Sequence, residues 1–428
     1  MSEQVHEAFP DIDGVLADPA RLLAADRAGL RARIGEASAG VGREVFLQAE
    51  AMFGVASVPR AEFASWLRFA ALAVGEREYA DRVTSAEPGM PWRTVWAWWR
   101  PANWFVASPS LNGDYYDVKV FEHAGRELVR VRNHWSVVWL DKATGRRVPE
   151  PDGDVAEGGW GSADGPVDLW DLELTAPESW AESWAFAAED GRTRYVWECE
   201  HGLAVFETDE QVLRDWPRGT VDCDPSDEIP DGPEPTVRRP EGPLTARELD
   251  DVYGENVLRV PEEELPELLQ HPGSRRHLRD VGVFRRWTGP SGQYQGHGAG
   301  AMTPPAAEEL SGTDLLTLGT CDYGDVFLHR REGSVHVLTR LDGVPGRTLV
   351  TIAPDLEVFT RTLEAVHRYS NACWHPYPTE VDQEFVRDHH FLDELDERSP
   401  GLFDRATPAG EFWSWMYAGI TELGVDGY

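Results

Sequence analysis

Basic residues are scarce in this chain of 428 residues. It has 40 Lys and Arg against 75 Asp and Glu, which gives a formal net charge of −35. Nucleic-acid binding without sequence preference needs Lys and Arg to displace phosphate counterions, so the composition argues against direct binding of DNA or RNA. The same charge disfavours anionic membrane surfaces. We expect the partners to be basic proteins, or small molecules held in a locally favourable pocket.

Cysteines and long apolar runs are also few. The four cysteines show no C-x-x-C spacing, and a chain of this size without a secretion signal more often keeps them reduced. The longest apolar stretch, residues 63–74, is interrupted by Arg68 and is too short to span a bilayer. Residues 1–7 lack the basic and apolar regions of a signal peptide. We therefore expect a soluble, cytoplasmic protein.

Motifs of catalysis and phosphate binding are missing from the sequence. It contains no P-loop, no G-x-G-x-x-G, no G-x-S-x-G, and no H-x-E followed by C-x-x-C. We therefore expect a protein that is not an enzyme and has no cofactor. The alternative is an enzyme hidden in residues 1–220, for which Asp114, Asp117 and His134 are the candidate ionisable cluster.

Two acidic stretches could be drawn as metal sites, but the sequence favours a structural role for both. Residues 222–227 carry three spaced acids, yet Pro225 and the lack of a turn glycine argue against a calcium loop. His389 and His390 stand among acids at 388–397. Adjacent histidines point apart on a helix, and a run of charges is usually a solvated face. No metal site is predicted.

The first 220 residues divide into a helical and a tryptophan-rich part. Asp18 followed by Pro19 is a helix N-cap with proline at the first helical position, and apolar residues recur at helical spacing over 45–53 and 63–70. Residues 90–216 hold 13 of the 18 tryptophans, and their short β-branched and aromatic runs predict an antiparallel sheet. Five tryptophans crowd together, and we expect core packing, with an exposed binding patch as the alternative: Trp92, Trp96, Trp98, Trp99 and Trp104.

A linker separates this part from the C-terminal part. Residues 221–242 combine acids and prolines with hardly any apolar residue. After them, Thr245-Ala-Arg-Glu248 is a capping box that opens a helix. Helices are predicted at 263–269, 274–280, 356–369 and after Thr407-Pro408, a strand at 257–260, and a meander of strands at 315–320, 325–329, 335–338 and 348–352. The sequence predicts an α+β protein with domains at 1–220 and 243–428.

Several short segments of the C-terminal part occur in an order that is found in a known protein family. They are Leu249-Asp-Asp-Val-Tyr-Gly254, Val257-Leu-Arg-Val-Pro261, Leu265-Pro266, Ser274–Val283, Leu318-Gly319, Asp322-Tyr-Gly324 with Val326–Leu328, Gly333–Val335 and Leu356–Leu363. Together with Phe412-Trp413 and Gly427-Tyr428 they resemble the fourth subfamily of the SUKH superfamily of immunity proteins. Two positions depart from the family pattern: Val283-Phe284 stands where Leu-Pro is usual, and Ala353-Pro354 where members often have Asn-Ser.

The resemblance implies a non-catalytic α+β domain that binds a cognate polymorphic toxin and occludes its active surface. Such toxins are often nucleases or nucleic-acid deaminases, and a phosphate-gripping enzyme has a basic cleft toward which an acidic protein is steered. Loop position and residue type suggest the contact residues Tyr294, His297, Asp322, Tyr323 and Trp374. The alternative is a two-domain adaptor with an aromatic binding patch in its N-terminal half. The sequence does not indicate the oligomeric state.

Overall fold

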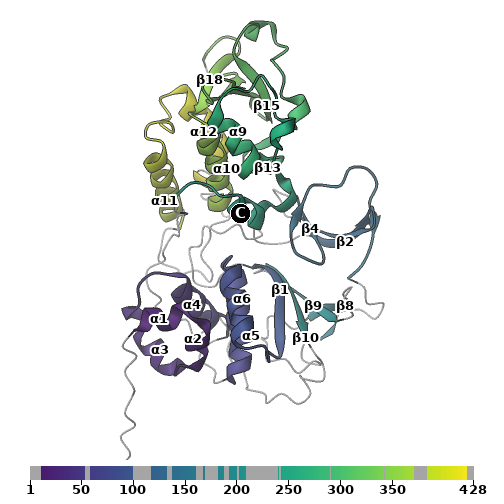
Figure 1. The fold of residues 1–428 in the computed structure, drawn as a ribbon, viewed down its shortest axis with the longest axis vertical. Helices are drawn as coiled ribbons and strands as arrows, with labels where there is room; N and C mark the ends of the chain where they lie inside the picture. Colours follow the sequence, from purple (N-terminus) through teal and green to yellow (C-terminus); the bar gives the residue numbers. More distant parts are fainter. Residues whose placement is uncertain are drawn as a thin grey trace, which may run out of the picture.

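The computed structural model describes residues 11–53, 58–99, 117–132, 137–160, 167–168, 182–187, 192–199, 202–208, 240, 242–289, 291–341, 343–370 and 383–421. Figure 1 shows two groups of elements: helices and two sheets from residues 12–208, and a further sheet with its helices from residues 246–421. The α+β class predicted from the sequence is confirmed.

The chain begins with a layer of helices. Asp18 caps one of them by accepting a hydrogen bond from the Ala20 amide at 2.9 Å, and Pro19 takes the first helical position as the sequence predicted. The longest helix of this layer is buried along nearly its whole length, because it packs between neighbouring helices and a sheet. The helices are α1 (Ile12–Ala17), α2 (Pro19–Ala24), α3 (Arg27–Arg33), α4 (Val41–Phe53), α5 (Arg60–Ala73) and α6 (Arg77–Ala86).

An antiparallel sheet packs against this helical layer. Its strand order is β1-β10-β9-β8-β7, and β1 lies along the buried helix α5. A β-bulge interrupts β1 between Thr94 and Trp96. The strands are β1 (Trp92–Trp99), β7 (Val167–Asp168), β8 (Glu182–Ala187), β9 (Thr193–Cys199) and β10 (Gly202–Thr208).

Core packing accounts for the tryptophans of β1. Trp92 meets Trp66 of α5 edge to face, with ring centroids 5.1 Å apart, and Trp99 meets Phe69 in the same way at 5.2 Å. Trp96 is buried on the opposite side of the strand. Within the described residues the crowd therefore forms core rather than an exposed patch; Trp104 lies outside them. This removes the main support for an adaptor with an aromatic surface there.

A second antiparallel sheet covers the other side of β1. It has the order β5-β4-β3-β2-β6, and apolar residues such as Val129 and Leu140 share a buried cluster with Trp96. Strands β2, β3 and β4 of this sheet fall within residues 90–216, where the β-branched and aromatic runs predicted an antiparallel sheet. Its strands are β2 (Asp117–His123), β3 (Arg126–Arg132), β4 (Val137–Asp141), β5 (Arg147–Val148) and β6 (Ala156–Glu157).

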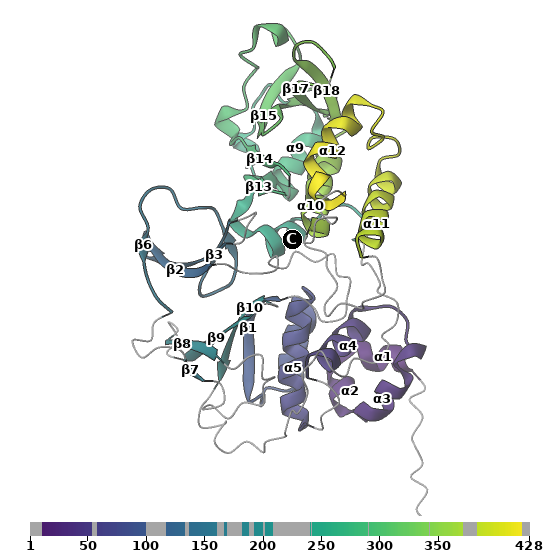
Figure 2. The ribbon, with the colours of Figure 1, turned by 180° about the vertical axis from the view of Figure 1, so that it is seen from behind.

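The C-terminal elements surround one large apolar core built from residues 244 to 417. A six-stranded antiparallel sheet in the order β13 to β18 packs against helices α10 and α12 (Figure 2). The predicted capping box is present at Thr245 and Glu248. The elements are α8 (Ala246–Tyr253), β11 (Val257–Leu258), α9 (Pro272–Arg276), β12 (Val283–Phe284), β13 (Arg286–Thr288), β14 (Gln293–Gly296), β15 (Leu315–Cys321), β16 (Gly324–His329), β17 (Val335–Thr339), β18 (Thr348–Ala353), α10 (Leu356–Ser370), α11 (Gln383–Arg398) and α12 (Pro408–Thr421).

The structure differs from the sequence-based expectation in two places. The predicted helix 263–269 is only a 3₁₀ turn at Glu262–Glu264, because Pro266 cannot supply a helical amide hydrogen bond. The segment around Tyr294 and His297, expected as a loop, contains strand β14. Its Gly296 permits close approach of another chain segment, since a Cβ there would lie 2.2 Å from the Phe284 carbonyl oxygen. Most of the predicted linker, residues 221–242, lies outside the described residues, so the domain boundaries remain a prediction.

Candidate functional site

A groove lies where β15 turns into β16 at one end of the C-terminal sheet. It has a volume of about 740 Å³ and opens between this turn, the end of β17 and helix α12. The residues that line it are Ser291, Cys321, Asp322, Tyr323, Gly324, Asp325, Leu338, Thr339, Arg340, Arg347, Trp415 and Ala418.

Two aromatic side chains form one wall of the groove. The rings of Tyr323 and Trp415 lie 5.4 Å apart at an angle of 36°. The Tyr323 hydroxyl donates to the carbonyl oxygens of Ser291 and Trp415, which fixes the ring between the turn and α12. Burial, together with the nearby Asp322 carboxylate, raises the pKa of Tyr323, so the phenol keeps its proton. The wall is therefore a rigid, half-buried aromatic surface.

Charged side chains of both signs surround the aromatic wall. The Asp322 carboxylate accepts a hydrogen bond from the Gln293 amide at 3.0 Å. Asp325 pairs with Arg347, which also lies 3.7 Å from Glu309. Arg340 is exposed and forms no ion pair with any residue that the structure describes. The groove thus offers an available cation beside an aromatic surface, although the whole chain is strongly acidic.

The thiol in the groove is not activated as a nucleophile. Burial raises the pKa of the Cys321 thiol to about 11, and its sulfur donates to the Gly324 carbonyl at 3.3 Å. A thiol with that pKa carries almost no thiolate at neutral pH. No histidine is found among the described lining residues to act as a base. The described lining therefore contains neither a reactive thiolate nor a histidine base.

The structure brings two of the five predicted contact residues together. Asp322 and Tyr323 both line the groove. Tyr294 lies in β14 rather than on a loop, and its buried ring packs edge to face against Phe359 with centroids 5.3 Å apart. The expected loop position of Tyr294 was therefore wrong, because this residue lies in a strand and its side chain faces the apolar core.

The other two predicted contacts are further from the groove or outside the described residues. His297 follows β14, is half-buried, and donates its backbone amide to Leu318 at 2.8 Å. Trp374 lies outside the described residues. Sequence analysis missed Trp415, Arg340 and Arg347 as groove residues. Trp415 could have been found, since it lies off the apolar face that Phe412, Trp413 and Met416 form on α12.

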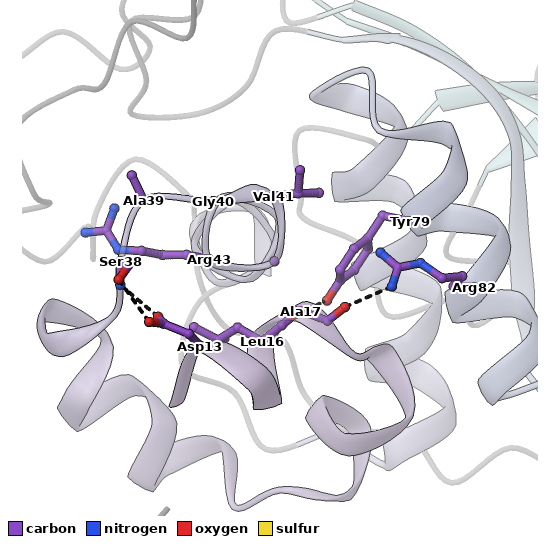
Figure 3. A pocket seen from close by; sticks show the side chains of 11 residues that line it. Asp13, Leu16, Ala17, Ser38, Ala39, Gly40, Val41, Arg43, Tyr79 and Arg82 are labelled. Atoms are coloured by element: carbon purple, nitrogen blue, oxygen red, sulfur yellow. Dashed lines mark hydrogen bonds between the residues drawn. The ribbon is translucent and has the colours of Figure 1, made fainter. Parts of the chain in front are cut away.

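A smaller hollow of about 370 Å³ lies in the N-terminal helical layer (Figure 3). Its polar groups hold helices together. The Tyr79 hydroxyl donates to the Leu16 carbonyl at 2.7 Å, and Arg82 donates to the Ala17 carbonyl at 2.9 Å. Asp13 accepts hydrogen bonds from the amide and hydroxyl of Ser38. These contacts stabilise the packing of α1 and α6. The polar side chains of this hollow therefore have a structural role.

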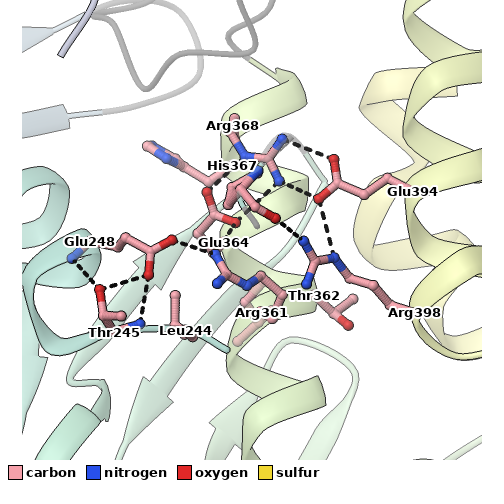
Figure 4. A network of polar contacts seen from close by, with 12 residues as sticks. Leu244, Thr245, Glu248, Arg361, Thr362, Glu364, His367, Arg368, Glu394 and Arg398 are labelled. Atoms are coloured by element: carbon pink, nitrogen blue, oxygen red, sulfur yellow. Dashed lines mark hydrogen bonds and ion pairs between the residues drawn. The ribbon is translucent and has the colours of Figure 1, made fainter. Parts of the chain in front are cut away.

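The acidic run of α11 is not wholly a solvated face. Glu394 is buried and accepts two hydrogen bonds from Arg368, at 2.6 and 3.0 Å, and one from Tyr369 at 3.0 Å (Figure 4). Burial works to raise the pKa of Glu394, but the hydrogen bonds and charge of Arg368 outweigh it and lower that pKa. Glu364 is the second carboxylate bound to Arg368.

No group of three His, Cys, Asp or Glu side chains that could hold a metal ion occurs in the described part of the chain. Of the three residues in the candidate cluster for an enzyme, Asp117 lies within the described residues and pairs with Arg130, whereas Asp114 and His134 fall outside them. Among the helices described, none has the length and apolar character to cross a membrane.

Comparison with known proteins finds a similarity in the part of the chain that holds most of the groove. No curated protein and no solved structure matches the chain. The model of one protein family, described as SUKH-4 immunity protein, does match, over residues 244–414. The matched segment contains the six-stranded sheet, α10, α11 and the groove residues up to Arg347. Residues 244–414 of this chain are therefore similar to the SUKH-4 immunity protein family.

Proposed function

We propose that this protein binds a cognate toxin of a polymorphic toxin system and neutralises it by covering the toxin's active surface. The observation that carries the proposal is the match of residues 244–414 to SUKH-4 immunity proteins. A family of immunity proteins indicates an immunity function, and binding without catalysis agrees with the half-buried, protonated thiol of Cys321 in the groove.

The groove is the proposed place of toxin contact. Binding energy in protein interfaces concentrates in a few aromatic and arginine side chains at the centre of the contact. Tyr323, Trp415 and Arg340 supply both kinds of side chain within one hollow. A specific complex would bury about 1,200–2,000 Å² in total, so the surrounding surface takes part as well. Asp322 lies at the edge of the groove as a polar contact.

The net charge of −35 supports a toxin with a basic surface, such as a nuclease or a nucleic-acid deaminase. An acidic protein is steered toward a basic cleft, and such steering raises association rates by about 10- to 1,000-fold at low salt. We expect the association rate with the toxin to fall steeply as salt rises, while the dissociation rate changes little.

The test uses the full-length protein and the toxin encoded beside it. Growth rescue in cells and calorimetry with purified proteins measure neutralisation and affinity. Trp415→Ala is expected to weaken binding by about 2 kcal/mol, roughly 30-fold, and Arg340→Ala by about tenfold. Arg276→Ala is the matched control, because Arg276 is also exposed and makes no ion pair with described residues of the same domain.

Two outcomes would contradict the proposal at different levels. If the full-length protein neither rescues growth nor binds that toxin, the immunity function is wrong for this partner. If it binds but Trp415→Ala and Arg340→Ala bind as tightly as Arg276→Ala, immunity stands and the groove is not the contact.

A further inference from the structure

A strand of the N-terminal region meets the C-terminal domain at the end of α8. In both ribbon views the sheet of β2 to β6 lies next to the base of that domain (Figures 1 and 2). Asn256 donates its side-chain amide to the Val148 carbonyl of β5 at 3.2 Å. Gly254 has a φ of +52°, and a Cβ at this position would lie 2.3 Å from the Arg147 carbonyl oxygen. The backbone of β5 therefore packs so closely against position 254 that only glycine fits there.

The side chain of Arg147 enters the C-terminal domain. One of its terminal nitrogens lies 3.1 Å from Nε2 of His367 on α10, and its guanidinium lies 4.7 Å from the centre of the Trp98 ring. His367 Nδ1 lies 3.2 Å from the Tyr253 hydroxyl. Arginine only donates, so Nε2 of His367 accepts and its ring proton lies on Nδ1, directed at the tyrosine. This set of contacts defines the imidazole tautomer.

Charge and burial agree with this assignment. Burial, with the Arg147 charge beside it, lowers the pKa of His367 well below its usual value, so the imidazole stays neutral. Burial also lowers the pKa of Arg147, to about 10, which leaves the guanidinium protonated at neutral pH. A cation donating to a neutral imidazole acceptor is thus the stable arrangement between the two regions.

Exposed ion pairs surround this buried centre. Arg126 of β3 pairs with Glu255 at 3.0 Å, and Arg286 at the start of β13 pairs with Glu150. A desolvated centre of Arg and aromatic residues within a charged rim is the anatomy of a specific protein interface. None of the residues in this contact lines the groove.

We propose that the SUKH-4-like domain has a second protein-binding surface, made by Tyr253, Gly254, Asn256 and His367, which accepts an arginine presented by a β-strand. Its partner is β5 of the same chain, inserted through Arg147. The N-terminal region is then a dedicated partner of the immunity domain, and the two stay associated without the peptide connection between them.

The first test cuts that connection in the full-length protein. A protease site is placed within residues 221–235, the purified protein is cleaved, and the two pieces are followed by size-exclusion chromatography at about 1 µM. We expect them to elute together at the volume of the uncut protein. Separate elution of the cleaved wild-type pieces would overturn the proposal.

The second test uses two adjacent arginines as a matched pair. Arg147→Met keeps the length of the side chain but removes the charge and the donors, whereas Arg146→Met makes the same change at an exposed position. We expect the affinity between the cleaved pieces to fall by about 100-fold or more for Arg147→Met, as for truncation of a buried charged contact, and to be unchanged for Arg146→Met. Equal affinities for the two variants would contradict the proposed role of Arg147.

Hydrogen exchange of the uncut variants separates loss of docking from loss of folding. Arg147→Met is expected to speed exchange in residues 137–148 and 253–258, the segments that face each other, and to leave α5 and β16 as protected as in the wild type. Faster exchange confined to residues near position 147, with 253–258 unaffected, would also overturn the proposal.

Discussion

Residues 12–208 divide their apolar side chains among three clusters in successive layers, whereas residues 244–417 gather almost all of theirs into one. The first region relies on large tryptophans placed between a helical layer and two sheets. Both regions bury charged side chains, but the buried histidines among the described residues, His277 and His367, lie in the second region, as does the buried pair of Arg368 and Glu394. We therefore expect loss of aromatic volume to damage the first region most, and mild acid to act on the second.

Loss of an aromatic ring is expected to have the largest effect on the N-terminal region. Trp92→Ala removes a ring that contacts both Trp66 and Phe206, and the site is 2% exposed, so a cavity remains. We expect the free energy of unfolding of this region to fall by about 3–5 kcal/mol, with no pH dependence of the loss. Hydrogen exchange of α5, monitored at increasing denaturant concentrations, measures this free energy of unfolding. An equal loss of protection in α10 would show that the two regions do not respond separately.

Breaking the buried ion pair is expected to have a slightly smaller effect, in the other region. Glu394→Gln leaves the Arg368 guanidinium with Glu364 as its charged partner in a buried setting. We expect α10 and α11 to lose about 3 kcal/mol of protection against hydrogen exchange. Glu267→Gln, at an exposed position of the same domain, is the control with the same charge change. A Glu394→Gln protein as stable as this control would contradict the importance of the network.

Mild acid is expected to destabilise the C-terminal domain by the smallest of the three amounts. Burial lowers the pKa of His277 from 6.5 to about 4, so the unfolded chain takes up a proton that the folded domain rejects. This stability is complete above about pH 6.5 and is lost as pH falls toward 4. Between pH 7 and pH 5 the loss is about 2 kcal/mol from this residue.

His277→Gln is the variant that checks the origin of this pH dependence. It removes the titrating group and keeps a hydrogen-bonding side chain opposite Thr360, whose hydroxyl lies 3.2 Å from His277 Nε2. Denaturation midpoints at several pH values should show a flatter profile for this variant than for the wild type. Identical profiles would assign the acid sensitivity to other groups, such as His367.

Local sequence patterns predicted most elements of the fold. Helix caps at Asp18 and Thr245 and the meander of β15 to β18 are confirmed, since each depends on neighbouring residues alone. Strand β14 was missed because its glycines resemble a loop unless the close approach of Phe284 is known.

The site and the contact between regions were less accessible to sequence reasoning. Asp322 and Tyr323 were found because a turn between strands is visible locally, while Trp415 reaches the same groove from a helix 92 residues further along. Arg146 and Arg147 look alike in the sequence, yet only Arg147 is buried, against a histidine 220 residues away. Partners so distant in the chain leave no periodic signal.

The bulge in β1 has a consequence for how this region is compared with its relatives. Trp92 and Trp99 belong to the cluster under the helices, while Trp96 and Trp98 belong to the cluster between the sheets. Strict alternation from Trp92 would instead place Trp96 and Trp98 on the same side as Trp92. Because Val95 is one inserted residue, two of the four rings face the cluster under the helices and two face the cluster between the sheets. In an alignment, a gap of one residue in this strand marks where the alternation restarts, and moving that gap would assign the tryptophans to the wrong layers.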